Sequence, residues 1–231
     1  MTAAGRPAGA DAPGMRRLAH RGDWRRAPEN SLAALQAALE VPACDGLEFD
    51  VRLSADGIPV LLHDDTLARV QGRPEAVGAM RADALEALGI PCLADVLAAV
   101  PRHVFLDVEL KGRHDRAVVE VLAAGRGATL RDAVISSFET ATLERVAGLV
   151  PSWPRWLCTT VLAPEEIDVA VELGCSGIVA GWQSIDAGSM ADARRAGIDV
   201  IAWTVRRRST FDRLSRLGVR AACVEAAALD G

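Results

Sequence analysis

Charged residues alternate with apolar ones along two short segments, 47–53 and 104–111. Because successive side chains of a β-strand point to opposite faces, each segment places its charges on one face. A strand of a parallel barrel is ordinarily apolar on both faces, so these charges need a partner or a function. The charged face carries Glu48, Asp50 and Arg52 in the first segment, and Phe105, Asp107, Glu109 and Lys111 share one face in the second.

The carboxylates of Glu48, Asp50 and Glu109 predict a site for one divalent cation. Buried charges without partners are strongly unfavourable, so these groups must pair or bind an ion. Ligation by oxygen alone suits Mg²⁺ or Ca²⁺ rather than zinc. A structural ion-pair network with Arg52 and Lys111 is the alternative. Lys111 is the only lysine among 26 lysine and arginine residues, which favours a role for its compact ammonium against a phosphate oxygen.

Two of the four histidines fall where they could act as a general acid and base near neutral pH. His20 ends the first predicted strand, and barrel enzymes carry their catalytic groups at that end. Asp56-Gly57 is a strong hairpin signal, and a hairpin would place His63 opposite Glu48 or Asp50. The other two histidines, His103 and His114, are expected at the surface.

These residues are expected on an α/β fold, a (β/α)8 TIM barrel. Short apolar runs alternate with amphipathic segments roughly every 25 residues, as in repeated βα units around a parallel sheet. A ninth run, 58–63, would fold back antiparallel after the second barrel strand, and residues 67–90 would form a small excursion near the barrel mouth. Asn30 is predicted to cap the first helix. The predicted barrel strands are 15–20, 46–53, 104–110, 132–137, 155–161, 176–180, 198–205 and 220–224.

The composition predicts one enzyme-sized domain, 15–231, after a flexible leader, 1–14. The chain has 231 residues, half of them hydrophobic, and its net charge of -5 argues against a nucleic-acid or anionic-membrane surface. No apolar stretch reaches the roughly 20 residues of a membrane span, and the leader lacks the features of a secretory signal. A cytoplasmic location is therefore expected, with the five widely spaced cysteines as free, buried thiols.

An ordered set of short motifs resembles the glycerophosphodiester phosphodiesterase family. Each motif is a weak signal alone, but the set in this order is specific. The close resemblance covers residues 15–111 and continues more loosely through 135–138 and 202–205. The motifs are His20-Arg21-Gly22, Pro28-Glu29-Asn30-Ser31, Glu48-Phe49-Asp50-Val51, Asp56-Gly57, His63-Asp64 with Thr66-Leu67, and Glu109-Leu110-Lys111.

The resemblance implies a barrel of the phospholipase-C-like phosphodiesterase superfamily that uses a divalent cation. Its substrate would be a small glycerophosphodiester, cleaved to glycerol 3-phosphate and an alcohol. Carried over residue by residue, the metal ligands would be Glu48, Asp50 and Glu109, and the acid and base His20 and His63. The substrate would contact Arg21, Lys111 and Trp203, while Glu29 and Asn30 would support the metal ligands.

The chain departs from the family pattern at two places near its end. Arg206 follows Trp203-Thr204-Val205 where the family usually has Asn, and this change is expected to alter the pocket wall. The segment Cys223-Val224-Glu225-Ala226 stands where the family has a Thr-Asp pair before proline. The second change is expected to affect the packing and closure of the last strand.

Two other functions fit parts of the pattern. A Mg²⁺-dependent lyase or isomerase would use Lys111 as a base next to a substrate carboxylate, but it leaves His20 and His63 without a role. A noncatalytic barrel would keep the site and bind a ligand, and the presence of every inferred catalytic residue argues against it.

Overall fold

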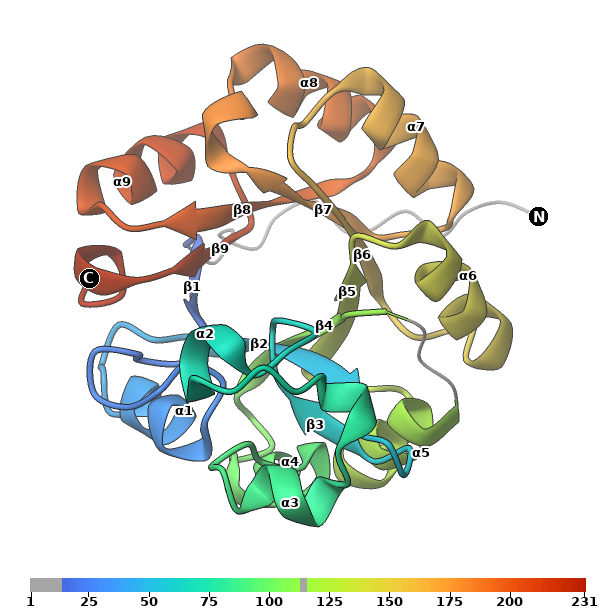
Figure 1. Cartoon of the computed structure of the whole chain (residues 1–231). Coiled ribbons are helices and arrows are strands. Elements are labelled where there is room, and N and C mark those ends of the chain that lie inside the picture. Colours follow the sequence, from blue (N-terminus) through green and yellow to red (C-terminus); the bar gives the residue numbers. More distant parts are fainter. Residues whose placement is uncertain (1–13, 113–115) are drawn as a thin grey trace.

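Parallel strands form a closed barrel in the computed structural model, which describes residues 14–112 and 116–231. Eight strands make the ring, and the first pairs with both the second and the last, which closes it (Figure 1). The predicted TIM barrel is confirmed, with each predicted strand end within two residues of the observed one. The ring strands are β1 (Arg16–His20), β2 (Gly46–Leu53), β4 (Phe105–Leu110), β5 (Ala133–Ser137), β6 (Arg155–Thr159), β7 (Gly177–Gly181), β8 (Asp199–Val205) and β9 (Ala221–Val224).

Helices surround the ring and connect its strands (Figure 1). α8 shows how sequence sets their ends. It begins with a capping box between Asp186 and Ser189, and it ends at Gly197, whose φ of 72° lies in the left-handed region. The outer helices are α1 (Leu32–Leu39), α4 (Leu93–Ala99), α5 (Arg116–Arg126), α6 (Thr140–Leu149), α7 (Pro164–Glu172), α8 (Ala187–Ala196) and α9 (Arg208–Leu217), with 3-10 turns η2 (Trp182–Ser184) and η3 (Ala226–Ala228).

Strand alternation divides the core into two layers. Leu47, Phe49 and Val51 of β2 are fully buried in the layer between the sheet and the helices, as predicted. The barrel interior has its own, smaller apolar cluster, which leaves the carboxyl end of the barrel to polar groups. That inner cluster consists of Leu18, Val134, Trp156, Cys158, Val179, Ile201, Ala221 and Cys223, with Phe105 and Trp203 packed against it.

The hairpin after β2 is confirmed, but its predicted register is wrong by one residue. β3 (Pro59–Leu61) pairs antiparallel with the end of β2, with Leu61 level with Val51. The turn holds three residues, 55–57, closed by the bond from the Ser54 N–H to the Ile58 carbonyl, with Gly57 at φ 76°. This three-residue loop shifts the partner of every residue by one, so His63 lies beyond the paired strand and faces neither Glu48 nor Asp50 across it.

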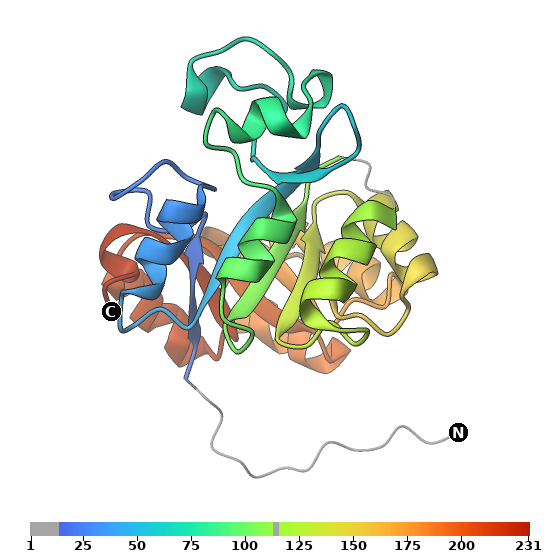
Figure 2. The same cartoon turned by 90° about the horizontal axis from the view of Figure 1, so that it is seen from below.

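The predicted excursion stands beyond the carboxyl ends of the barrel strands (Figure 2). It contains α2 (Ala68–Gln71), η1 (Val77–Ala79) and α3 (Ala82–Glu86). A separate apolar cluster holds it together, and this cluster includes Val60 of β3. The other buried members are Leu62, Leu67, Val77, Ala82, Leu85, Ile90 and Cys92.

The expected disturbance of the last strand is not observed. β9 pairs with β1 on one side and β8 on the other, and Val224 is fully buried. All five cysteines are free, as predicted, and four of them are buried, whereas Cys44 is only half-buried. Over residues 14–112 and 116–231, no helix is long and apolar enough to cross a membrane. The predicted surface position of His103 is confirmed, whereas His114 and leader residues 1–13 lie outside the described residues.

Candidate active site

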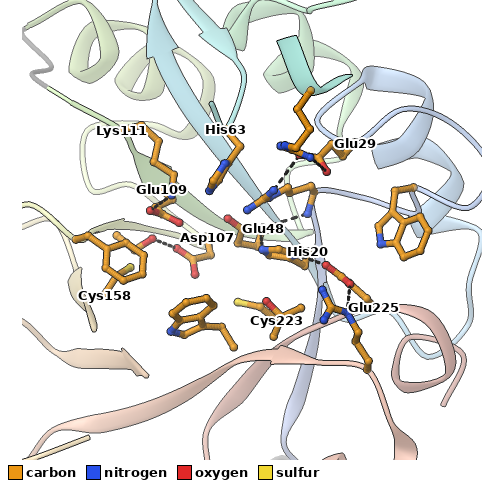
Figure 3. A pocket seen from close by; sticks show the side chains of 18 residues that line it. His20, Glu29, Glu48, His63, Asp107, Glu109, Lys111, Cys158, Cys223 and Glu225 are labelled. Carbon is orange, nitrogen blue, oxygen red and sulfur yellow. Dashed lines mark hydrogen bonds and ion pairs between the residues drawn. The ribbon is translucent and has the colours of Figure 1, made fainter. Parts of the chain in front are cut away.

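The carboxyl ends of the barrel strands surround a cavity of about 780 Å³. The register of the parallel strands brings its acidic residues together. His20 is level with Glu48, Glu48 is level with Asp107, and two residues further along Asp50 is level with Glu109. Asp50 and Asn30 are buried behind the cavity wall. The other predicted site residues all line it, namely His20, Arg21, Glu29, Glu48, His63, Glu109, Lys111 and Trp203 (Figure 3).

The three predicted metal ligands form one cluster. Glu48, Asp50 and Glu109 each offer a carboxylate oxygen, and the three oxygens lie within 4.8 Å of one another. All three residues are buried. A fourth carboxylate, Asp107, lies deeper in the barrel and accepts a hydrogen bond of 2.6 Å from the Ser136 hydroxyl.

Two cations contact this cluster. The Lys111 ammonium forms ion pairs with Glu109 and with Asp50, whose Oδ1 lies 3.2 Å from Nζ. Arg21 Nε lies 3.0 Å from Asp50 Oδ2, and the Arg21 backbone N–H donates to Glu48 Oε2 at 3.2 Å. Arg52, the other cation of the predicted ion-pair alternative, instead donates two hydrogen bonds to the His63 carbonyl.

Burial and mutual repulsion separate the pKa values of the carboxylates. Burial raises the pKa of Glu48, and the nearby charges of Asp50 and Glu109 raise it further. Burial likewise raises the pKa of Glu109 to about 7, with Asp50 adding to the effect. Asp50 behaves differently, because Arg21 and Lys111 outweigh its burial and lower its pKa to about 2. Asp50 is thus the carboxylate that the cations hold in its charged form.

The cluster can hold a divalent cation. Asp50 Oδ1 and Glu109 Oε1 are buried, and both contact the Lys111 ammonium. A carboxylate oxygen has more than one lone pair, so each can also donate an electron pair to an ion. Together with Glu48 and Asp107, these residues make four carboxylates against the two cations Arg21 and Lys111. A divalent ion would balance that difference, and carboxylate oxygens are the donors that hard cations prefer.

Both histidines hold their Nδ1 atoms against carboxylates. His20 Nδ1 lies 2.6 Å from Glu225 Oε1, and His63 Nδ1 lies 2.6 Å from Asp64 Oδ1. His20 lies between Glu225 and Glu48, with its Nε2 3.8 Å from Glu48 Oε2, and His63 stands on the opposite side of the cluster (Figure 3). The two imidazoles therefore meet at one cavity, although the register that predicted this was wrong.

The loop after β1 supplies the two residues predicted to support the ligands. The Asn30 amide donates to Asp50 Oδ2 at 2.9 Å and its carbonyl oxygen accepts the Asp50 N–H at 3.2 Å. Asn30 has a φ of 57°, and the cap of α1 is Ser31, whose hydroxyl accepts the Ala34 N–H. The predicted Asn30 cap is therefore wrong, because the Asn30 side chain is used to hold Asp50. Glu29 forms an ion pair with Arg21 at 2.9 Å.

An aromatic wall closes one side of the cavity. Trp203 Nε1 donates to the Thr159 carbonyl at 2.9 Å, which fixes the indole. Phe138 packs against it edge to face, with 5.5 Å between ring centroids, and is 42% exposed. An exposed aromatic beside a fixed indole offers an apolar surface to a bound molecule.

The sequence did not identify several residues at the site. Arg69 of the excursion pairs with Glu29 and Asp64 across the cavity mouth, and Asp64 was part of a motif without an assigned role. Arg206 and Glu225, which the sequence marked only as departures from the family pattern, pair with each other, with 2.7 Å between Arg206 Nε and Glu225 Oε2. The one available signal was charge at strand ends, since Arg206 and Glu225 directly follow β8 and β9.

A closed parallel barrel with an acidic, histidine-containing cavity at its carboxyl edge places this chain among the TIM-barrel enzymes. Residues 20–228 match the glycerophosphoryl diester phosphodiesterase family, and the chain belongs to that family. The predicted resemblance is confirmed.

Relatives of known sequence or structure support this assignment over nearly the whole chain. A glycerophosphodiester phosphodiesterase of Caldanaerobacter subterraneus is 26% identical over 220 residues, which cover 87% of this chain and 90% of the relative. An Oleispira antarctica phosphodiesterase, solved in complex with the product sn-glycerol-3-phosphate, is 26% identical with a TM-score of 0.81, covering 91% of this chain and 93% of that one. A glycerophosphodiester phosphodiesterase from Agrobacterium tumefaciens is 25% identical with a TM-score of 0.80, covering 94% of this chain and 98% of that one.

Proposed function

We propose that this enzyme hydrolyses glycerophosphodiesters to glycerol 3-phosphate and an alcohol, with a bound divalent cation and two histidines. The observation that carries the proposal is the convergence of three carboxylates, two imidazoles and two cations in and directly behind the wall of one cavity. Membership of the glycerophosphoryl diester phosphodiesterase family and the product complex of the Oleispira relative support the substrate class.

Glu48, Asp50 and Glu109 would hold the cation, which we propose to be Mg²⁺ or Ca²⁺. When bound, the ion supplies Lewis-acid stabilisation of a phosphate oxygen. Asn30 fixes Asp50 through two hydrogen bonds, so one ligand is held before any ion arrives. Glu29 holds the Arg21 guanidinium from the other side.

Arg21 and Lys111 would bind the phosphate through its nonbridging oxygens. Both cations already contact carboxylates in the cavity, so the site keeps positive charge where negative charge develops at phosphorus. Burial acts to lower the pKa of Lys111, but Asp50 and Glu109 outweigh it and raise the pKa. An ammonium with a raised pKa is a poor general base, which counts against the lyase and isomerase alternative.

The two histidines would transfer the protons of the reaction. Burial lowers the pKa of His63, which favours the neutral imidazole that can take a proton from the attacking oxygen. His20 would give a proton to the oxygen of the leaving alcohol as its bond to phosphorus breaks. The attacking oxygen belongs either to water or to the neighbouring glycerol hydroxyl of the substrate. Attack by the glycerol hydroxyl would give a cyclic phosphate, which water would then open.

Trp203 would form the wall against which the bound diester lies. Its indole is fixed by the Thr159 carbonyl, and it packs against the exposed ring of Phe138.

We also propose that residues 15–231 act as one catalytic domain, since the barrel closes between β1 and β9. A cytoplasmic location is proposed from the five free thiols, which suit a reducing compartment.

The direct test is an assay with glycerophosphocholine and related diesters, with and without a chelator. We expect release of glycerol 3-phosphate that depends on Mg²⁺ or Ca²⁺ and stops on chelation. A phosphodiester without a glycerol group serves as the control substrate. Failure to release glycerol phosphate from any of the diesters with either ion would refute the proposal.

A further inference from the structure

Three adjacent parallel strands bring a row of charged groups to one level of the barrel. Val205 of β8 is level with Val224 of β9, which is level with Ala19 of β1. These three side chains are buried in the layer between the sheet and the helices. The residue that follows each of the three along the chain therefore turns inward, toward the cavity. The inward residues are Arg206, Glu225 and His20, and all three line the cavity.

Glu225 stands between two partners and uses a different oxygen for each. Its Oε1 lies 2.6 Å from His20 Nδ1, and its Oε2 accepts a hydrogen bond of 2.7 Å from Arg206 Nε. The residue is only 6% exposed, and its backbone N–H donates to the Val205 carbonyl at 2.9 Å. Main chain and side chain of Glu225 are therefore both fixed.

We infer that Glu225 is a positioning residue that orients His20 for catalysis, and that Arg206 acts through Glu225. A carboxylate accepts hydrogen bonds but cannot donate them, so this contact places a hydrogen on His20 Nδ1. The ring then turns its other nitrogen, Nε2, toward the carboxylate cluster, where Glu48 Oε2 lies 3.8 Å away. Orienting an imidazole through its Nδ1 is an effective way to set the nitrogen that meets the substrate.

The two departures from the family pattern are thereby explained as one contact. Arg206 and Glu225 are 19 residues apart in the chain but directly follow neighbouring strands. Arg206 lines the cavity with a side chain that is 67% exposed, so it adds little to the core, and the described side chain of the site that it contacts is Glu225. The inference rests on the proposed hydrolysis, because its readout is turnover.

The test compares the steady-state kinetics of Glu225→Ala and Glu225→Gln with those of the wild type on glycerophosphocholine. We expect Glu225→Ala to lower kcat by about 10- to 100-fold, the range found for partners that orient metal-ligating histidines, with little change in KM. Glu225→Gln keeps an oxygen that can accept the Nδ1 hydrogen, so it should retain more activity than Glu225→Ala.

A double-mutant cycle tests the role of Arg206. Arg206→Ala should lower kcat several-fold in the wild-type background and have no further effect in Glu225→Ala, because it acts only through that carboxylate. Arg207→Ala is the matched control, since Arg207 is an exposed neighbour that does not line the cavity. If Glu225→Ala fails to fold, Glu225→Leu, which fills similar space but cannot accept a hydrogen bond, takes its place in the cycle.

Two results would overturn the inference. One is a kcat of Glu225→Ala within about twofold of the wild type. The other is an equal loss on Arg206→Ala in both backgrounds, which would show that Arg206 acts independently of Glu225. Either result leaves wild-type turnover, and hence the proposed function, in place. An inactive wild-type enzyme would instead count against the proposed function itself.

Discussion

At the scale of single residues, the two histidines share one arrangement although they come from different parts of the fold. His20 ends a barrel strand and His63 follows the hairpin, yet each places Nδ1 2.6 Å from a carboxylate. The partners, Glu225 and Asp64, stand 205 residues and one residue away along the chain, respectively. The same local chemistry at both rings suits a pair that exchanges protons with one substrate.

If both histidines act as proposed, replacing either one should sharply lower turnover without unfolding the protein. His20→Asn and His63→Asn are each expected to lower kcat by about 100- to 10,000-fold, the contribution of a positioned general acid or base. Steady-state release of glycerol phosphate measures the effect, and circular dichroism checks the fold. His103→Asn is the control, because His103 is exposed and does not line the cavity. Wild-type turnover in either cavity variant would remove that histidine from the mechanism.

The sequence predicted the acidic residues of the site but not all of their neighbours. Alternation along β2 and β4 was sufficient for Glu48, Asp50 and Glu109, because a strand fixes the face of every second residue. Arg69 pairs with Glu29 from 40 residues away, through a short helix of the excursion. Strand periodicity carries no information about such a contact.

At the scale of elements, the loop after β1 packs closely against α1. Gly22 has a φ of 82°, and a Cβ there would lie 2.5 Å from the Ala34 backbone carbon of α1. The same loop carries Arg21, Glu29 and Asn30, so its path sets the position of the Arg21 guanidinium and the support of Asp50. A side chain at Gly22 would push the loop away from the helix.

Gly22→Ala should accordingly destabilise the protein more than an equivalent change in the hairpin. Gly57 also has a positive φ, of 76°, but an added Cβ meets nothing within 4 Å, so Gly57→Ala isolates the backbone cost of about 1 kcal/mol. We expect the free energy of unfolding in urea to fall by at least about 2 kcal/mol more for Gly22→Ala. Equal losses in the two variants would mean that the loop and α1 move apart at little cost.

Strand positions were predictable, whereas the hairpin register was not. The barrel strands came out within two residues of prediction because their apolar runs are bounded by turn residues. The register depended on whether the hairpin around Asp56-Gly57 has a two-residue or a three-residue loop. Asp and Gly are typical of both loop types, so the sequence does not distinguish them. The three-residue loop moved His63 beyond the strand, where the loop that follows directs it into the cavity.

At the scale of the whole molecule, the excess of buried acid should make stability depend on pH. Burial raises the pKa of Asp107 to about 7 and that of Glu109 to about 7, and it also raises the pKa of Glu48. A carboxyl group whose pKa is raised on folding stabilises the protein fully below its unfolded pKa and loses that contribution as the pH rises through its folded pKa. Burial lowers the pKa of His63, and this shift makes stability rise with pH. It is one group against the three carboxyl groups, so the fall should dominate.

The melting temperature of the metal-free protein should therefore fall between about pH 5 and about pH 8. A divalent cation binds the deprotonated carboxylates, so adding it should raise the melting temperature more at pH 8 than at pH 5. Differential scanning fluorimetry with Mg²⁺ or Ca²⁺ measures both effects, and Glu109→Gln should reduce the rise. A melting temperature that stays constant from pH 5 to pH 8 and does not change on adding metal would contradict the proposed role of the acidic cluster.

The most direct measurement of the central claim is the return of activity when a divalent cation is titrated into chelated enzyme. Release of glycerol 3-phosphate from glycerophosphocholine should be absent after chelation and should recover to a plateau with Mg²⁺ or Ca²⁺ in the wild type. It should recover equally in Glu120→Gln, a matched change of an exposed glutamate, but not in Glu109→Gln. Full turnover in the chelated wild type, or normal recovery in Glu109→Gln, would contradict a catalytic cation held by Glu48, Asp50 and Glu109.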